Sequence, residues 1–519
     1  MHTTWQSLAW KEWHEHKWKL VSITAILWGV IILVMLVEQR VPSDRLPLAA
    51  ALVTFCTLPL AVFIGLGTAA SEASRKTLPF LQALPVPMYC IATWKLLFGL
   101  VTLFVPILLA ACLIYLSSLV PNVAGQTARA VSQLDVHSAT GSWFVDLLLV
   151  ASSVSASLFI WSAAAGVNRK DEVSAGAVAL AVIANWYLAV IAFIYAISSF
   201  YGGSPSAEKD RLLATMVSTA PGGFVWSLSG APHQQYWVFI AVAAVTTHAA
   251  LVAWYISRFG RVASLERRSP KSVDRTATIA DWLGRPRQSR FTAIAWKQFR
   301  ESLPLVSAGL TGVVGIVTLF FVSDIGYMRS PGGFPEVFSG VSISLGFGIA
   351  MIVGIGVCLQ DVTPGINSFW RSRPINPDAW FWTKYITGLL VLLTAINAPL
   401  LAILFALHPD PWRVVGDESA LITPTVHLAI FAAAVAMTCL VRQAVYAAIL
   451  SISLVYVGAV VGIGLWFVAS LMGIVPGAQP SWWEPTNPQI AFGMLLSFVT
   501  STIIAWLAMR YDWGRKSRY

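Results

Sequence analysis

The chain has 519 residues, of which 57% are hydrophobic and 11% are charged, whereas about a quarter of the residues in an average soluble domain are charged. Its mean hydropathy of +0.71 excludes an ordinary soluble protein and indicates an integral membrane protein. The basic residues that give the net charge of +10 lie between apolar runs, and no soluble basic domain carries them. Nucleic-acid binding is therefore not expected.

Twelve apolar runs predict membrane-spanning helices. About 20 helical residues cross the hydrocarbon layer, and backbone polar groups there must bond within the helix. Only Arg442 and Gln443 divide the tenth span from the eleventh. The predicted spans are 20–37, 46–70, 92–117, 142–166, 174–199, 236–257, 303–323, 337–359, 381–407, 424–441, 444–472 and 489–509.

The segment before the first span is amphipathic. Residues 5–13, WQSLAWKEW, place apolar side chains on one helical face and charge elsewhere, which is typical of a helix in the membrane interface. Residues 291–299, FTAIAWKQF, match this segment 286 positions later. The residues expected on the two interfacial helices are Trp5, Leu8, Trp10, Trp13, Phe291, Ile294, Trp296 and Phe299.

A polar turn follows the second span and another follows the eighth. The stretch PFLQALPVPMYCIATWKLLFGLV at 79–101 is matched by SFWRSRPINPDAWFWTKYITGLL at 368–390, which is 289 positions later. Apolar residues at helical spacing, then two prolines, predict a short helix with an apolar knob in each. The knobs either pack on their own bundle or dock a cytosolic partner, and their repetition favours docking. The expected contact residues are Phe80, Leu81, Leu84, Pro85, Phe369, Trp370, Arg373 and Pro374.

These two matches divide the chain into two units. Residues 1–258 form a first six-helix unit, 259–290 a basic cytoplasmic linker, and 291–519 a second six-helix unit with a basic tail. An even number of spans in each unit makes the units parallel copies. The expected fold class is an all-α integral membrane protein with about twelve transmembrane helices in two parallel repeats, each preceded by an interfacial elbow helix.

Basic residues predict the orientation, because Lys and Arg stay on the cytoplasmic side. With both termini in the cytoplasm, 27 of the 34 Lys and Arg lie on cytoplasmic segments or span ends. The five cysteines lie in or beside predicted spans, so no disulfide framework is implied. The first helix lacks a small-residue cleavage site, and we expect it to stay as an anchor.

Together these motifs resemble the permeases of type-2 ATP-binding-cassette exporters. The resemblance comes from an AWK helix, two spans joined by an FLxxLPV turn with Lys95 nine residues after Val86, and a six-span unit. In that family the first helix is the elbow helix, and the turn is the coupling helix that contacts the ATPase. The likeness covers 5–258 and 291–511. The second copy departs from the first because Arg373 stands where the first has Leu84.

The resemblance implies a permease that moves a hydrophobic or amphipathic substrate outward across a prokaryotic cytoplasmic membrane. Its partner is a separate cytosolic ATPase dimer, which carries the ATP and Mg²⁺. The sequence agrees with ATP binding on a separate chain, because it contains no phosphate-binding loop of the form G-x-x-x-x-G-K-[ST] and no Gly-Lys dipeptide. We therefore expect no enzymatic activity and no bound cofactor in this chain.

A twelve-span secondary transporter driven by ions is the alternative. Such transporters generally need ionisable residues deep in the bilayer, and Asp146 and His248 are the candidates found here. They form no obvious relay, and a lone intramembrane histidine is more often a packed hydrogen-bonding group. His14 and His16 point about 200° apart on a helix, so no metal site is predicted. No catalytic cluster is evident.

Overall fold

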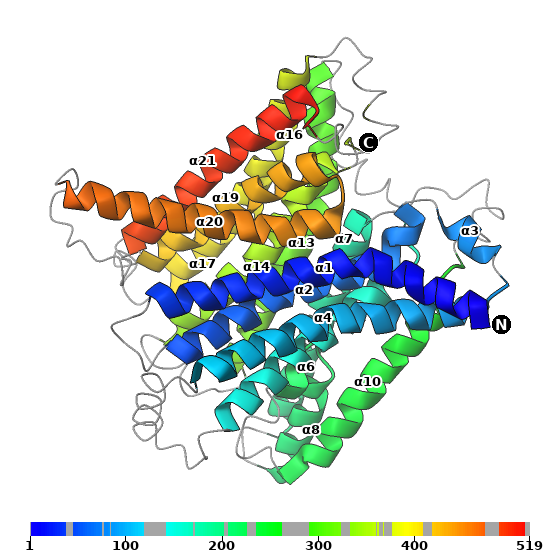
Figure 1. Cartoon of the computed structure of the whole chain (residues 1–519). Helices are drawn as coiled ribbons and strands as arrows, with labels where there is room; N and C mark the ends of the chain where they lie inside the picture. Colours follow the sequence, from blue (N-terminus) through cyan, green and yellow to red (C-terminus); the bar gives the residue numbers. More distant parts are fainter. Residues whose placement is uncertain are drawn as a thin grey trace. The chain divides into compact units, whose positions relative to one another are not determined.

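The fold is described from a computed structural model of the chain, shown in Figure 1. Within the described residues the chain forms helices and turns, and no strand occurs. The structure describes residues 2–37, 45–74, 77–83, 85–118, 142–169, 172–201, 206–225, 235–261, 290–322, 333–359, 361–362, 367, 376–407, 418–472 and 487–513.

Helices long enough to cross a membrane recur along these residues. Nine helical segments among them are sufficiently long and apolar, and α14 adds a shorter apolar stretch. The chain is therefore an all-α protein of multi-pass membrane character, while the number of twelve spans stays a prediction. The main helices are α1 (His2–Val37), α2 (Arg45–Ser74), α3 (Leu78–Gln82), α4 (Met88–Ser118), α6 (Ser142–Gly166), α7 (Glu172–Phe200), α8 (Ala207–Ser218), α10 (Trp237–Arg258), α13 (Arg290–Val322), α14 (Gly333–Cys358), α16 (Pro377–Leu392), α17 (Ala398–Leu407), α19 (Glu418–Val441), α20 (Ala444–Leu471) and α21 (Asn487–Tyr511).

The helices form two compact units. The described part of the first lies within 1–170 and 196–259, and that of the second lies within 171–195, 260–472 and 486–519. Most of α7 thus groups with the second unit, although the sequence places its span in the first half. Small residues on α13 explain this, because Gly312 and Gly315 admit the α7 side chains at close range.

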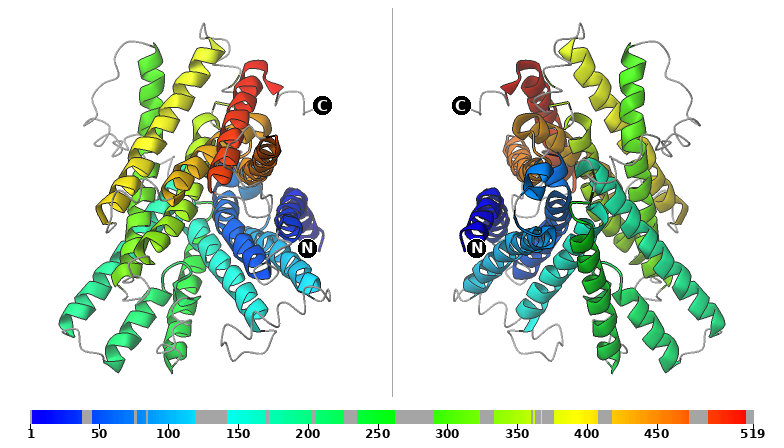
Figure 2. Two further views of the ribbon diagram at one scale, coloured as in Figure 1. Left: turned by 90° about the vertical axis from the view of Figure 1, so that its left-hand side faces the viewer. Right: turned by 90° about the vertical axis from the view of Figure 1, so that its right-hand side faces the viewer.

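In the first unit α1 lies along α4, and α2 lies along α6 and also packs on α4. The neighbouring positions of α2 and α6 can be followed in both views of Figure 2. Leu27, Leu60 and Phe159 are fully buried between these helices. Burial of such apolar side chains is what holds one helix against another here.

In the second unit α19 packs on both α14 and α21, and α20 packs on α21. Asn376 caps α16 through a hydrogen bond from Asp378 N to its side-chain oxygen at 2.9 Å. A π-helical turn, η3 (Leu393–Asn397), then joins α16 to α17. The expected break between the tenth and eleventh apolar runs is confirmed, because Arg442 turns the chain with a left-handed φ of 59°.

The elbow segments are continuous with the helices that follow them. α1 runs unbroken for 36 residues and α13 for 33, so a separate elbow helix is wrong for both. At the start of α1, Trp10 and Trp13 are exposed while Glu12 and His16 are buried, and the interfacial position expected for the tryptophans stays a prediction. The charged residues share the stripe that continues into the buried Ile23 and Leu27, so packing on α4 draws them inward.

The other expected elbow residues are exposed, half-buried or outside the described residues. Phe291 is exposed, and Ile294, Trp296 and Phe299 are half-buried. The side chains of Trp5 and Leu8 lie outside the described set, as does most of the linker, 262–289.

Candidate functional site

The short helix predicted after α2 is present as α3. Pro79 lies in its first turn, and Phe80 is 66% exposed, as expected for a projecting knob. Leu81 does not project with it, which corrects the expectation, because its side chain faces the bundle and is fully buried. Pro85 is exposed, and Leu84 lies outside the described residues.

The start of α3 is fastened to the last turn of α2. Thr77, which precedes α3, donates from its backbone N to Glu72 O at 3.0 Å. Its hydroxyl donates to the Glu72 carboxylate, so it is not used to cap α3. Both bonds tie the position of Phe80 to that of Glu72.

Glu72 belongs to a buried ion cluster that joins three helices. The Lys95 ammonium of α4 lies 2.7 Å from Glu72 Oε1 of α2 and 3.0 Å from Glu12 Oε1 of α1. The three side chains are between 0% and 5% exposed. A buried charge without a partner costs several kcal/mol, so each of these side chains depends on the others.

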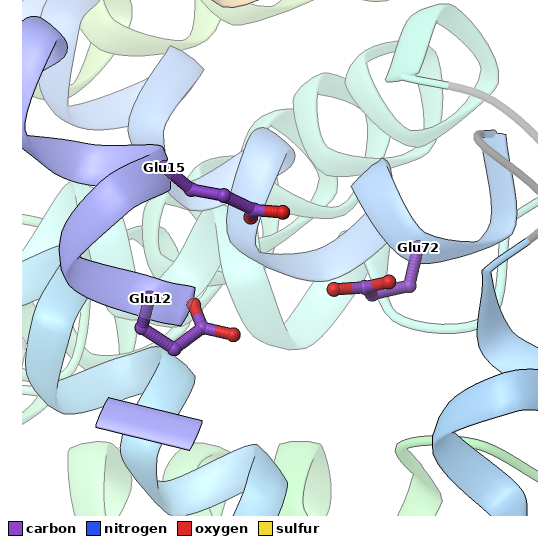
Figure 3. A group of neighbouring side chains, drawn as sticks. All are labelled: Glu12, Glu15 and Glu72. Atoms are coloured by element: carbon purple, nitrogen blue, oxygen red, sulfur yellow. The ribbon is translucent and has the colours of Figure 1, made fainter. Parts of the chain in front are cut away.

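A second lysine lies at the edge of this cluster. Lys11 Nζ is 2.8 Å from Glu72 Oε1 and 3.8 Å from Glu15 Oε1. Figure 3 shows Glu12 and Glu15 reaching from α1 toward Glu72, and one oxygen from each lies within 4.8 Å of the others. That spacing suits a metal ion, but the two ammonium groups already approach these oxygens and supply the positive charge.

The second unit has a related ion pair. Lys384 of α16 binds Asp361, and these residues stand 289 positions after Lys95 and Glu72. The Lys384 ammonium also lies 5.0 Å from the centroid of the Trp380 ring. At this site in each unit, a lysine in a helix beyond the turn pairs with a carboxylate before the turn.

The second turn itself is described only in part. Phe369, Trp370, Arg373 and Pro374 lie outside the described residues. Asn367 is buried, and its Nδ2 donates to Asp512 Oδ1 at 3.1 Å. Arg442 pairs with the same aspartate, which ties one point of the turn to α19 and α21.

His248 packs as a hydrogen-bonded side chain, which confirms the preferred interpretation of that residue. Its Nε2 lies 2.7 Å from Ser157 Oγ and its Nδ1 lies 2.7 Å from Ala244 O. The side chain of Asp146 lies outside the description.

Sequence reasoning missed the buried ion cluster of the first unit and the buried His427 of the second. The cluster was detectable, because Glu12 and Glu72 are charged beside apolar runs, Lys95 stands within the predicted span 92–117, and Glu72 matches Asp361 at the same offset as the turns. His427 lies inside the tenth apolar run and is fully buried. Its Nδ1 is 2.8 Å from Asn397 Oδ1 and its Nε2 is 3.2 Å from Ser342 O.

Together, α3 and the ion cluster connect the segment that carries Phe80 to three helices of the first unit, α1, α2 and α4. No protein-family model, no curated protein and no solved structure matches the chain.

Proposed function

We propose that the chain is the permease of an ATP-driven exporter, with two six-helix units fused in one polypeptide. A separate cytosolic ATPase dimer binds ATP and Mg²⁺ and docks on the turns after α2 and α14. The substrate is hydrophobic or amphipathic. The host membrane is a prokaryotic cytoplasmic membrane with both chain termini inside. This proposal rests on the motifs and on the geometry of α3.

The observation that carries it is the exposed Phe80 on a fastened helix. A large apolar side chain held in water on a short, fixed helix suits docking into a partner's pocket, where aromatic anchors dominate affinity. Thr77 links α3 to Glu72, and Lys95 links Glu72 to α4 and α1. A partner that moves α3 would therefore move three helices together.

Matched contacts support the two-unit arrangement. An ideal Cβ on Gly65 of α2 would lie 2.7 Å from Phe159 O of α6. An ideal Cβ on Gly354 of α14, 289 positions later, would lie 2.6 Å from Phe431 O of α19. With the Lys95 and Lys384 ion pairs, these contacts are what two fused copies of one unit would make.

The test is to look for a phosphate-loop ATPase among the reading frames that neighbour this chain's gene and to measure its co-purification with the chain. Truncation of an aromatic anchor costs about 2 kcal/mol or more, which is about thirtyfold in affinity. We expect Phe80→Ala to weaken ATPase binding by about that factor and to leave the melting temperature nearly unchanged. The double variant F369A/W370A should weaken binding similarly through the second turn.

Two variants serve as controls for this experiment. Phe200→Ala removes an aromatic ring that is 82% exposed, against 66% for Phe80, on the predicted outer side, and it should leave ATPase binding intact. Leu81→Ala removes a buried side chain and should lower the melting temperature by loss of packing. If Phe80→Ala and F369A/W370A retain the ATPase as tightly as the parent does, the turns are internal packing and the proposal fails.

An ion-coupled transporter is the second candidate, and His427 is the observation that favours it. A fully buried ionisable side chain in a membrane helix is a candidate ion or proton site. Its partner Asn397 lies in η3, and π-helical turns frequently mark functional sites.

Transport measured at constant ATP separates the two candidates. Under the exporter proposal, flux in vesicles should survive collapse of the proton gradient, and the chain without its ATPase should carry no coupled flux. Flux that disappears with the gradient, or in a stable His427→Asn variant alone, would assign the chain to the ion-coupled class.

A further inference from the structure

The buried histidine of α1 lies between two helices. His16 is 6% exposed, and its ring Nδ1 lies 2.8 Å from the Thr102 hydroxyl of α4. Its Nε2 lies 3.8 Å from Glu12 Oε2, one turn earlier on α1. Phe98 packs beside the ring, with 6.3 Å between ring centroids. The imidazole is thus held by a hydroxyl on one side and a carboxylate on the other.

The hydrogen bonds of Thr102 fix which nitrogen of His16 carries a hydrogen. The Thr102 hydroxyl donates its single hydrogen to Phe98 O at 2.7 Å, so its oxygen must accept from Nδ1. A neutral ring would then turn the lone pair of Nε2 toward the Glu12 carboxylate. Two acceptors facing each other in a buried place repel, whereas a proton on Nε2 gives a cation beside an anion.

The other oxygen of Glu12 is already approached by a cation. Lys95 Nζ lies 3.0 Å from Glu12 Oε1, which leaves Oε2 toward His16. The remaining charged and titratable groups around the pair come from three helices and are Lys11, Glu15 and Lys19 of α1, Glu72 of α2 and Tyr255 of α10.

We propose that His16 and Glu12 form a buried proton-binding site in the first unit, with the proton carried on His16 Nε2 and its charge balanced by the Glu12 carboxylate 3.8 Å away. The ligand is a proton, and its binding adds the attraction between a cationic His16 ring and the Glu12 carboxylate, while the bond from Nδ1 to Thr102 is made with or without it. This site goes beyond the proposed export function and does not depend on it.

The second unit carries a version of the same pair that binds no proton. Gln298 and Ser302 stand 286 positions after Glu12 and His16, and Gln298 Nε2 donates to Ser302 Oγ at 2.8 Å. Both are buried, and neither titrates near neutral pH. The chain therefore supplies its own neutral replacement for the proton site.

The test measures melting temperature against pH for the purified full chain in lipid nanodiscs, from about pH 5 to about pH 9, a range that brackets histidine titration. A proton bound more tightly in the folded state stabilises at low pH, and that stabilisation is lost as pH rises. We expect the parent to lose about 2 °C more than His16→Ser across this range. The double variant E12Q/H16S, which copies Gln298 and Ser302, should fold, and its melting temperature should depend on pH as weakly as that of His16→Ser.

His14→Ser is the matched control, because His14 is exposed two residues away and its loss should leave the parental profile unchanged. The site is refuted if the parent, His16→Ser and E12Q/H16S share one pH profile. A measurement on the unaltered chain covers the case in which the variants do not fold. Nitrogen NMR of the eight labelled histidines should show one ring still doubly protonated at about pH 8, above ordinary histidine titration, and eight neutral rings would refute the site.

Discussion

At the scale of single residues, Lys95 joins three helices of the first unit through buried ion pairs. It is 2% exposed and pairs with carboxylates from two different helices, whereas Lys384 in the second unit pairs with Asp361. Where the first unit places Glu12, the second places the neutral Gln298. Loss of the lysine therefore removes ion pairs with two carboxylates in the first unit, where Lys11 still lies 2.8 Å from Glu72, and an ion pair with one carboxylate in the second.

This difference predicts unequal costs for equivalent substitutions. Lys95→Met should lower the free energy of unfolding by about 3–5 kcal/mol, because removing one partner of a buried ion pair leaves an uncompensated charge. Lys384→Met should cost less, since Lys384 pairs with one carboxylate whereas Lys95 pairs with two. Thermal unfolding of both variants measures the difference.

Lys11→Met is the control for this comparison. The Lys11 side chain is 30% exposed and should contribute about 1 kcal/mol or less. Equal destabilisation by Lys11→Met and Lys95→Met would contradict the central place of Lys95 in the cluster.

At the scale of helices, both units contain a close crossing at a matched glycine. The approach of α2 to α6 at Gly65, and of α14 to α19 at Gly354, leaves no room for a methyl group beside a backbone oxygen. Close approach at small residues is how helices pack in a membrane, where the hydrophobic effect does not drive them together.

These crossings predict that G65A and G354A each destabilise the protein by about 1–3 kcal/mol, because the added methyl group forces two backbones apart. Gly29 and Gly348 lie in helices with nothing within 4 Å of an ideal Cβ. G29A and G348A should therefore be neutral or should stabilise by up to about 1 kcal/mol, through helix propensity. Melting curves in one detergent compare all four variants, and equal effects would contradict the packing argument.

At the scale of the whole molecule, membrane orientation is the property that functional proposals depend on. The distribution of Lys and Arg predicts that α3 lies on the cytoplasmic side and α8 on the outer side. In a background without the native cysteines, Glu208→Cys should react with an impermeant thiol reagent in intact cells, and Gln82→Cys should react only after lysis. Labelling of position 82 in intact cells would show that the predicted orientation is wrong and that α3 lies outside the cytosol.

The sequence by itself determined the membrane class, most helix positions and the short helix after α2. Apolar length and proline placement act locally along the chain, so they can be read without a fold. The break at Arg442 was predicted for the same reason, since one helix could not hold so long an apolar run. The helix α8 was not predicted, because its 12 residues are mixed in polarity and lie in a presumed loop.

Only the tertiary structure decided which faces point inward. The Trp-rich start of α1 predicted an apolar stripe in the membrane interface but did not indicate that Glu12 and His16 lie inside, where they contact Lys95 and Thr102 of α4. It likewise separated Phe80 from Leu81, adjacent residues that helical rotation sends to opposite environments. A buried charge is stable where partners distant in sequence converge on it, and that convergence is a property of helix packing that no local pattern contains.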